Sequence, residues 1–250
     1  MNIEKASLYE KYRLPYAREA IDDLLGITGD VQVVVDIGAG TGQLARLFAG
    51  RCEKVYAIEP DTAMRQVAAI ALADYPSVEI MAGCAEKIPL AHESIDLIVI
   101  GNALHRFKPE ACDELRRILK KNGWIALFRY VFTHRAYMEM LFTKLADLSS
   151  VVNRIDEASY HTPAEALIGE GQIRKFSYSQ SCLEDWGTFF GAACAGMEAP
   201  EPHEGDFAHF EAINRDVFDA FSMDGKIKIE YETQVTFGQP LVSWTESTVL

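Results

Sequence analysis

The stretch Val33-Val34-Val35-Asp36-Ile37-Gly38-Ala39-Gly40-Thr41-Gly42 decides the fold. Its first half is apolar and mostly β-branched, which is typical of a central parallel strand that is buried on both faces. Its second half has glycine at three alternate positions, and Leu44, Leu47 and Phe48 then follow with helical spacing. Glycines at a strand-to-helix turn let the backbone approach a ligand closely, beside the free N–H groups of the helix start. The stretch therefore predicts a ligand-binding turn in an α/β domain.

The same alternation of strand and helix continues along the first half of the chain. Apolar runs at residues 55–59, 78–81, 95–100 and 124–128 indicate four more strands, with helical patterns between them. Strands that alternate with helices predict a doubly wound, mostly parallel sheet. Later segments have helical periodicity, and residues 227–235 alternate with period two, as an antiparallel or edge strand does. The whole chain is thus expected to be one α/β domain.

Composition and charge exclude several functions. The 250 residues are 49% hydrophobic and 24% charged, and the formal net charge is −13. A nucleic-acid binder usually presents a basic face, because phosphate contacts supply most of its affinity. Anionic membrane surfaces are disfavoured for the same reason. We therefore expect neither nucleic acid nor membrane as a partner.

The five cysteines and the absence of long apolar runs indicate the compartment. The cysteines are widely spaced and form no C-x-x-C pair, which argues against a disulfide framework or a zinc site and fits a reducing cytoplasm. No segment approaches the ~18 apolar residues of a membrane span, and the first residues lack the apolar region of a signal peptide. We expect a cytoplasmic protein without a metal site.

Two classes of cofactor use a glycine turn of this kind. The dinucleotide fingerprint G-x-G-x-x-G would need glycine at position 43, which is Gln43. The spacing here is instead D-x-G-x-G-x-G from Asp36 to Gly42. In this motif the chain resembles the class I S-adenosylmethionine-dependent methyltransferases.

Further motifs extend the resemblance over the first half of the chain, and together they are most similar to the small-molecule branch called type 11. Glu59 ends the second strand, where the family places an acidic residue on the ribose hydroxyls. Ala85 and Glu86 match the segment that covers the adenine, although Cys84 replaces its usual aspartate. Residues 102–107 match the N-x-L-H segment after the fourth strand, and residues 9–16 resemble the tyrosine-rich segment that covers the methionine end of the cofactor.

The resemblance implies a Rossmann-like fold with a mostly parallel seven-stranded sheet. It implies a single methyltransferase domain over residues 1–250, with N-terminal cap helices at 1–29 and a helical lid insertion at 131–171. The implied cofactor is S-adenosyl-L-methionine. The residues expected to bind it are Tyr12, Arg13, Asp36, Gly38, Ala39, Gly40, Gly42, Glu59, Pro60, Met64, Ala85, Glu86, Asn102 and Ala103.

The expected reaction is methyl transfer to a small-molecule acceptor, at the oxygen of a hydroxyl or a carboxylate. A hydroxyl must lose its proton, and His105 is the candidate general base, weighed against a structural hydrogen bond. His134 and His161 have weaker claims, and residues 186–190 hold aromatic side chains suited either to an acceptor pocket or to the core. Two alternatives stay open, a nicotinamide-dependent oxidoreductase and a non-catalytic S-adenosylmethionine-binding module. The protein is expected to be a monomer or a homodimer.

Overall fold

A computed structural model describes residues 1–146, 148, 164–169, 172–196 and 198–240. Its centre is an eight-stranded sheet with the order β3-β2-β1-β4-β5-β8-β6, in which β7 pairs with β8 alone. The parallel part comprises β1 (Val33–Ile37), β2 (Lys54–Glu59), β3 (Val78–Ala82), β4 (Ile95–Gly101) and β5 (Leu119–Phe132). The antiparallel part comprises β6 (Arg174–Asp185), β7 (Ser222–Met223) and β8 (Lys226–Gly238). The predicted mostly parallel, doubly wound sheet is confirmed. The eighth strand is the two-residue β7, the short arm of a hairpin with β8.

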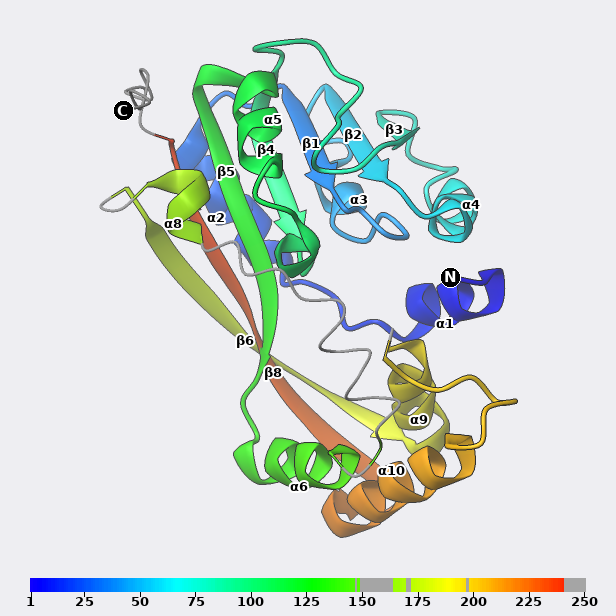
Figure 1. Ribbon diagram of the computed structural model, residues 1–250. Helices are drawn as coiled ribbons and strands as arrows, with labels where there is room; N and C mark the ends of the chain where they lie inside the picture. Colours follow the sequence, from blue (N-terminus) through cyan, green and yellow to red (C-terminus); the bar gives the residue numbers. More distant parts are fainter. Residues whose placement is uncertain (147, 149–163, 170–171, 197, 241–250) are drawn as a thin grey trace, which may run out of the picture.

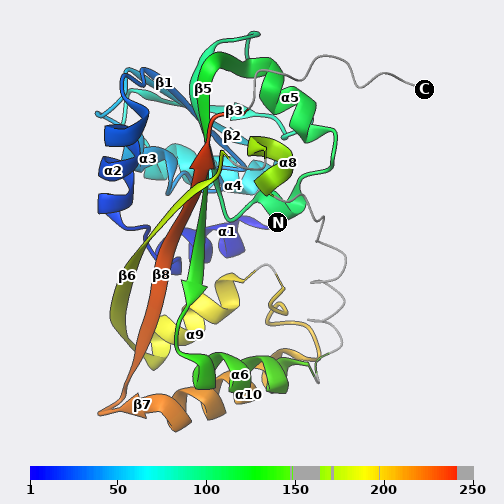
Figure 2. The same cartoon turned by 90° about the vertical axis from the view of Figure 1, so that its left-hand side faces the viewer.

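Helices cover both faces of the parallel part of the sheet (Figure 2). On one face α2 (Arg18–Thr28) and α3 (Ala45–Phe48) bury Leu24 and Phe48 against the strands. On the other face α5 (Ala111–Ile118) and α8 (Ala164–Ile168) bury Leu115 and Ile168. The burial of strand residues on both sides explains why β1 and β4 are apolar in sequence except for Asp36 and Asp96.

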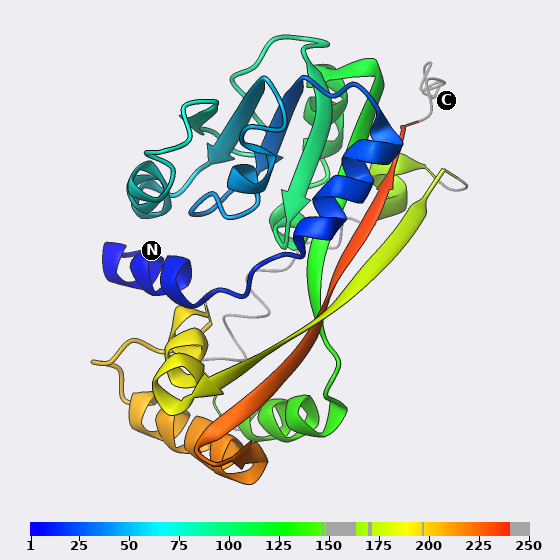
Figure 3. The same cartoon turned by 180° about the vertical axis from the view of Figure 1, so that it is seen from behind.

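The three long strands β5, β8 and β6 continue past the parallel sheet as a twisted ribbon (Figures 1 and 3). At its far end lie α6 (Arg135–Leu145), α9 (Trp186–Ala195) and α10 (Phe207–Phe221), which form a second lobe with its own apolar cluster. The segment predicted as a lid, residues 131–171, contributes α6 to this lobe, whereas its α8 packs on the sheet. Residues 149–163 of that segment, which include His161, lie outside the described residues.

Helix α1 (Ile3–Tyr12) lies between the two lobes (Figure 1). It contacts α4 (Thr62–Ala71) of the first lobe through Ala6, which is buried with Met64 and Val67. It also contacts α9 of the second lobe, and the Nζ of Lys5 donates a hydrogen bond of 2.8 Å to the carbonyl oxygen of Ala199. Of the two helices in residues 1–29, α1 therefore covers the space between the lobes and α2 packs on the sheet.

Close packing requires glycine in the turn after β1 as much as ligand access does. Gly38, Gly40 and Gly42 all have positive φ angles, of 72°, 57° and 85°. A Cβ at Gly38 would lie 2.7 Å from the Cβ of Ala103, and one at Gly42 would lie 2.4 Å from the Cδ1 of Leu72. The helix expected to start at the glycines begins only at Ala45, because residues 41–44 form turns.

Substitution at Gly42 separates backbone strain from packing. Gly42→Ala and Gly50→Ala both place a Cβ at positive φ, which costs about 1–2 kcal/mol, but no atom lies within 4 Å of a Cβ at Gly50. We expect Gly42→Ala to lower the free energy of unfolding by a further 1–3 kcal/mol or so, the usual cost of overpacking. Urea unfolding measures both variants, and equal losses would contradict the role of Leu72.

Candidate active site

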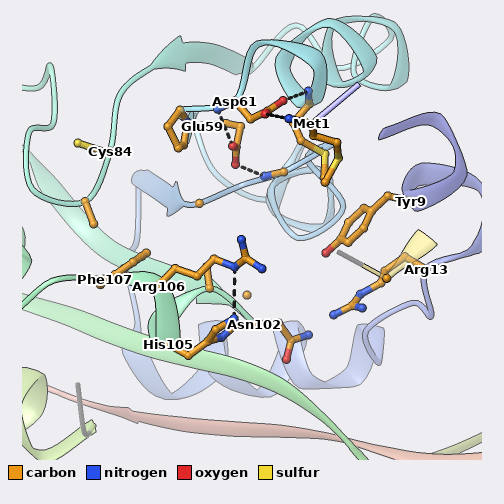
Figure 4. Close-up of a pocket in the computed structure, with 18 of the residues that line it drawn as sticks. Met1, Tyr9, Arg13, Glu59, Asp61, Cys84, Asn102, His105, Arg106 and Phe107 are labelled. Atoms are coloured by element: carbon orange, nitrogen blue, oxygen red, sulfur yellow. Dashed lines mark hydrogen bonds and ion pairs between the residues drawn. The ribbon is translucent and has the colours of Figure 1, made fainter. Parts of the chain in front are cut away.

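The first of two adjoining pockets lies at the carboxyl ends of β1, β2 and β4, where α1 closes it (Figure 4). Its volume is about 370 Å³. Figure 4 shows Glu59 on one side of this pocket and Tyr9 and Arg13 across from it. Of the residues predicted to bind a cofactor, those that line it are Arg13, Gly38, Gly40, Glu59, Pro60, Met64, Ala85, Glu86, Asn102 and Ala103.

The carboxylate of Glu59 joins the ends of β1 and β2. Its Oε2 accepts a hydrogen bond of 2.8 Å from the backbone N–H of Gly40, and its Oε1 accepts one of 2.9 Å from that of Asp61. Burial raises the pKa of Glu59 above its ordinary value. Since a carboxylate has about four acceptor positions, Glu59 keeps capacity for a ligand in the pocket.

Three predicted cofactor residues, Asp36, Ala39 and Gly42, do not line this pocket. The Oδ2 of Asp36 accepts a hydrogen bond of 3.1 Å from the backbone N–H of Ala45, at the start of α3. Its Oδ1 is buried without a hydrogen-bond partner among the described residues, and burial raises the pKa of Asp36 to about 8. These three residues shape the turn from inside the protein.

The tyrosine-rich N-terminal segment contributes to both pockets. The guanidinium of Arg13 lies 5.1 Å from the ring centroids of Tyr9 and Tyr130, and its buried Nε has no hydrogen-bond partner among the described residues. Tyr9 lines the first pocket, whereas the predicted Tyr12 lines only the second and packs against Gly191. Sequence reasoning did not single out Tyr9, although its i, i+4 spacing to Arg13 places both on one helix face.

Residues after β4 form the border between the pockets. Asn102 has φ of 51°; its Nδ2 donates to the hydroxyl of Tyr16 at 3.0 Å, and its Oδ1 accepts from the backbone N–H of Tyr130 at 3.3 Å. His105 lies in the short helix η1 (Leu104–Arg106), and its Nε2 accepts from the Nε of Arg106 at 3.3 Å. Burial lowers the pKa of His105, which keeps the imidazole neutral near pH 7. His105 lines the first pocket but not the second.

The second pocket, of about 360 Å³, is predominantly apolar and lies between the ribbon and the helices of the second lobe. It shares Arg13, Asn102, Gly196 and Glu198 with the first pocket, so the two are continuous. Its other described lining residues are Tyr12, Leu14, Tyr130, Phe132, Tyr137, Met138, Leu141, Phe142, Leu145, Glu184, Phe189, Ala192, Ala193, Ala195, Ala199, Phe210, Asn214 and Ile229.

Some aromatic and histidine side chains considered for the site lie elsewhere. Phe189 lines the second pocket, but Trp186 and Phe190 do not; their rings stack on each other at 4.9 Å. The Nδ1 of His134 accepts a hydrogen bond from the backbone N–H of Tyr137 and caps the start of α6.

Within the described part of the chain, no group of three or more His, Cys, Asp or Glu side chains could hold a metal ion. The five cysteines are free thiols. None of the described helices is both long enough and apolar enough to cross a membrane.

Comparison with known proteins identifies the domain. Residues 35–127 match the family described as "Methyltransferase domain". An uncharacterized methyltransferase of Mycobacterium tuberculosis is 37% identical over 120 residues, which are 48% of this chain and 47% of that protein. One of Schizosaccharomyces pombe is 32% identical over 115 residues, 45% of this chain and 44% of that protein. The chain thus spans about half the length of the curated relatives it matches.

Solved structures of low sequence identity share the fold. A putative type II methyltransferase from Anaeromyxobacter dehalogenans has a TM-score of 0.59 at 16% identity, covering 92% of this chain and all of that one. The YcgJ protein from Bacillus subtilis has a TM-score of 0.55 at 17% identity, covering 90% and 100%. Residues 35–127 therefore match a methyltransferase domain of the type 11 group in sequence, and the chain shares its fold with solved methyltransferase structures.

Substitution of Glu59 tests the predicted contact of its carboxylate with the cofactor ribose. In Glu59→Gln an amide N–H₂ meets one of the two backbone N–H donors, and the charge that favours a diol is lost. We expect the Kd for S-adenosylhomocysteine to rise by roughly 10- to 100-fold, which corresponds to the 1–3 kcal/mol of a hydrogen bond to a charged group.

Isothermal titration calorimetry measures this Kd. Glu79→Gln, on β3 and paired with Lys54, removes the same charge from outside the pocket and is the control. An unchanged Kd in Glu59→Gln would show that Glu59 only caps the turn.

Proposed function

We propose that this chain transfers the methyl group of S-adenosylmethionine to the oxygen of a small-molecule acceptor. The observation that carries the proposal is the continuity of the two pockets. The first pocket, at the glycine turn, opens into the apolar second pocket through Arg13, Asn102, Gly196 and Glu198. This arrangement suits a cofactor in the first pocket and an acceptor in the second.

The residues of the first pocket fit the cofactor. Glu59 presents a carboxylate to the ribose hydroxyls, and the open face of Gly40 leaves room for close approach, since a Cβ there would only reach the Tyr9 ring at 3.8 Å. The unsatisfied Nε of Arg13 suits the methionine carboxylate, and the ring of Tyr9 suits a positive sulfur. Pro60, Met64, Ala85 and Glu86 line the part assigned to the adenosine.

Alignment and exclusion of water are the main tasks of the protein residues. When bound, S-adenosylmethionine supplies an already activated methyl group on its sulfonium sulfur. Asn102, held by Tyr16 and by the Tyr130 backbone, fixes the border at which the acceptor oxygen would be presented. Orientation of this kind contributes a large part of the rate of a displacement reaction.

The charges around the second pocket favour a hydroxyl acceptor over a carboxylate. Its described charged side chains are Arg13, Glu184 and Glu198, and Arg13 faces the methionine carboxylate in this proposal. Glu198 forms an ion pair with Arg106 at 4.0 Å, so Glu184 is the described carboxylate that repels an anionic acceptor. A hydroxyl proton must leave, and the neutral His105 at the end of β4 is the proposed base.

Gly40→Val tests cofactor binding at the turn. A β-branched side chain at φ of 57° is strained and fills the space between the turn and Tyr9, so we expect no measurable binding of S-adenosylhomocysteine by calorimetry. Gly50→Val carries similar strain away from the pocket and should bind as the wild type does. Normal affinity in Gly40→Val would refute the site.

His105→Ala tests the choice of oxygen. With a hydroxyl acceptor, found by screening for S-adenosylhomocysteine release, kcat should fall by roughly 10²–10⁴, the range for a positioned base. Because the pKa of His105 is lowered, the wild-type rate should rise with pH through a midpoint below the ordinary histidine value of about 6.5 and then reach a plateau.

The pH–rate profile provides the discriminating measurement. The acidic limb should disappear in His105→Ala and persist in His92→Ala, which alters an exposed histidine of a loop. A wild-type profile that is flat from about pH 5.5 to 8.5 would exclude a base that titrates in that range and favour carboxylate methylation.

A further inference from the structure

Glu184 is a buried carboxylate on the inward face of the ribbon. Along β6 the side chains alternate between exposed and covered, and Leu183 is 66% exposed whereas Glu184 is only 7% exposed. Glu184 pairs with Ile227 of β8 in the antiparallel register and lines the second pocket. A charged residue thus occupies a position where the strand pattern calls for an apolar one.

The carboxylate of Glu184 has little to stabilise its charge. Its hydrogen bond within the described structure comes from the Sγ of Cys182 at 3.5 Å, and a thiol is a weak donor. No lysine, arginine or histidine of the described residues forms an ion pair with it, and burial raises its pKa. The buried carboxylates Asp36 and Glu59, by contrast, each accept backbone N–H bonds.

The surroundings of Glu184 are aromatic and aliphatic. Tyr137, Phe189 and Ile229 line the same pocket and belong to the apolar cluster of the second lobe. Buried charges need a partner, because an uncompensated one costs several kcal/mol or so. Glu184 lies away from the border with the first pocket, since only Arg13, Asn102, Gly196 and Glu198 line both.

We propose that the acceptor is an apolar, ring-sized molecule that carries a protonated amine, and that this amine donates to Glu184. The inference rests on the proposed function and specifies its substrate class. The ring of the acceptor packs beside Tyr137 and Phe189, and its nucleophilic oxygen points toward Asn102. A cation satisfies Glu184 better than a neutral donor does, because the pair is charge-assisted and the aromatic rings also attract positive charge.

Three matched probes test the inference: tyramine, 4-propylphenol and 3-(4-hydroxyphenyl)propionate. They share a phenol and differ in having an ammonium, a methyl or a carboxylate group at the end of the side chain. Calorimetry on the protein saturated with S-adenosylhomocysteine should give tyramine an affinity about tenfold or more above that of 4-propylphenol, the scale of a charge-assisted bond. The propionate should bind most weakly.

Glu184→Gln should remove the preference for tyramine and leave the affinity for S-adenosylhomocysteine unchanged. Glu139→Gln removes the same charge from the exposed side of α6, outside the pocket, and should keep the preference. If Glu184→Gln does not fold, the order of the wild-type affinities for the three probes tests the inference.

Two results would overturn this inference alone: wild-type protein that binds S-adenosylhomocysteine but does not prefer tyramine, including one that binds no probe, or a preference that survives Glu184→Gln. Either would mean that Glu184 stays protonated beside Cys182 as a structural residue. Absence of S-adenosylhomocysteine binding in the wild type would instead overturn the proposed function, and the inference with it.

Discussion

The antiparallel pairing of β8 with β5 on one side and β6 on the other is the interaction on which both pockets depend. The pairing of β5 with β4 ends at Phe128, whereas its pairing with β8 continues to Phe132. Backbone hydrogen bonds to β8 therefore support the end of β5 beyond the parallel sheet. The helices α6, α9 and α10 lie at the far end of this ribbon. Without the lobe that they form, the carboxyl ends of the parallel strands would face solvent.

A cluster of tyrosines fixes the border between the pockets. The rings of Tyr16 and Tyr130 stack at 4.5 Å, the hydroxyl of Tyr16 accepts from Asn102, and the hydroxyl of Tyr130 donates to the carbonyl oxygen of Leu14. Burial raises the pKa of both tyrosines, so the hydroxyls stay protonated. Their bonds hold Asn102 in a left-handed conformation that an isolated chain would rarely adopt.

Local patterns in the sequence predicted the first five strands, the glycine turn and α10, because each depends on nearby residues. The end of β6 was not predicted: residues 183–195 have helical spacing, yet β6 runs to Asp185 because it pairs with β8. The inward position of Glu184 follows from that non-local pairing, and no local pattern in the sequence predicts it. Lys120 and Gly123 likewise have the cation and the glycine that are typical of a helix end, but strand pairing places them in β5. Tyr9 lines the first pocket and Tyr12 the second, and α1, which carries both, packs on α4 and on α9.

The position of α1 links the two pockets physically. Its apolar side packs on Met64 and Val67 of the first lobe, and Lys5 reaches Ala199 of the second. Residues from the end of α1 onward line both pockets, so one helix covers the glycine turn and the apolar pocket together. Exclusion of water from the first pocket and from the second is therefore one property of the fold. A displacement of α1 that admitted a ligand to either pocket would also expose Arg13, whose guanidinium lies between the rings of Tyr9 and Tyr130.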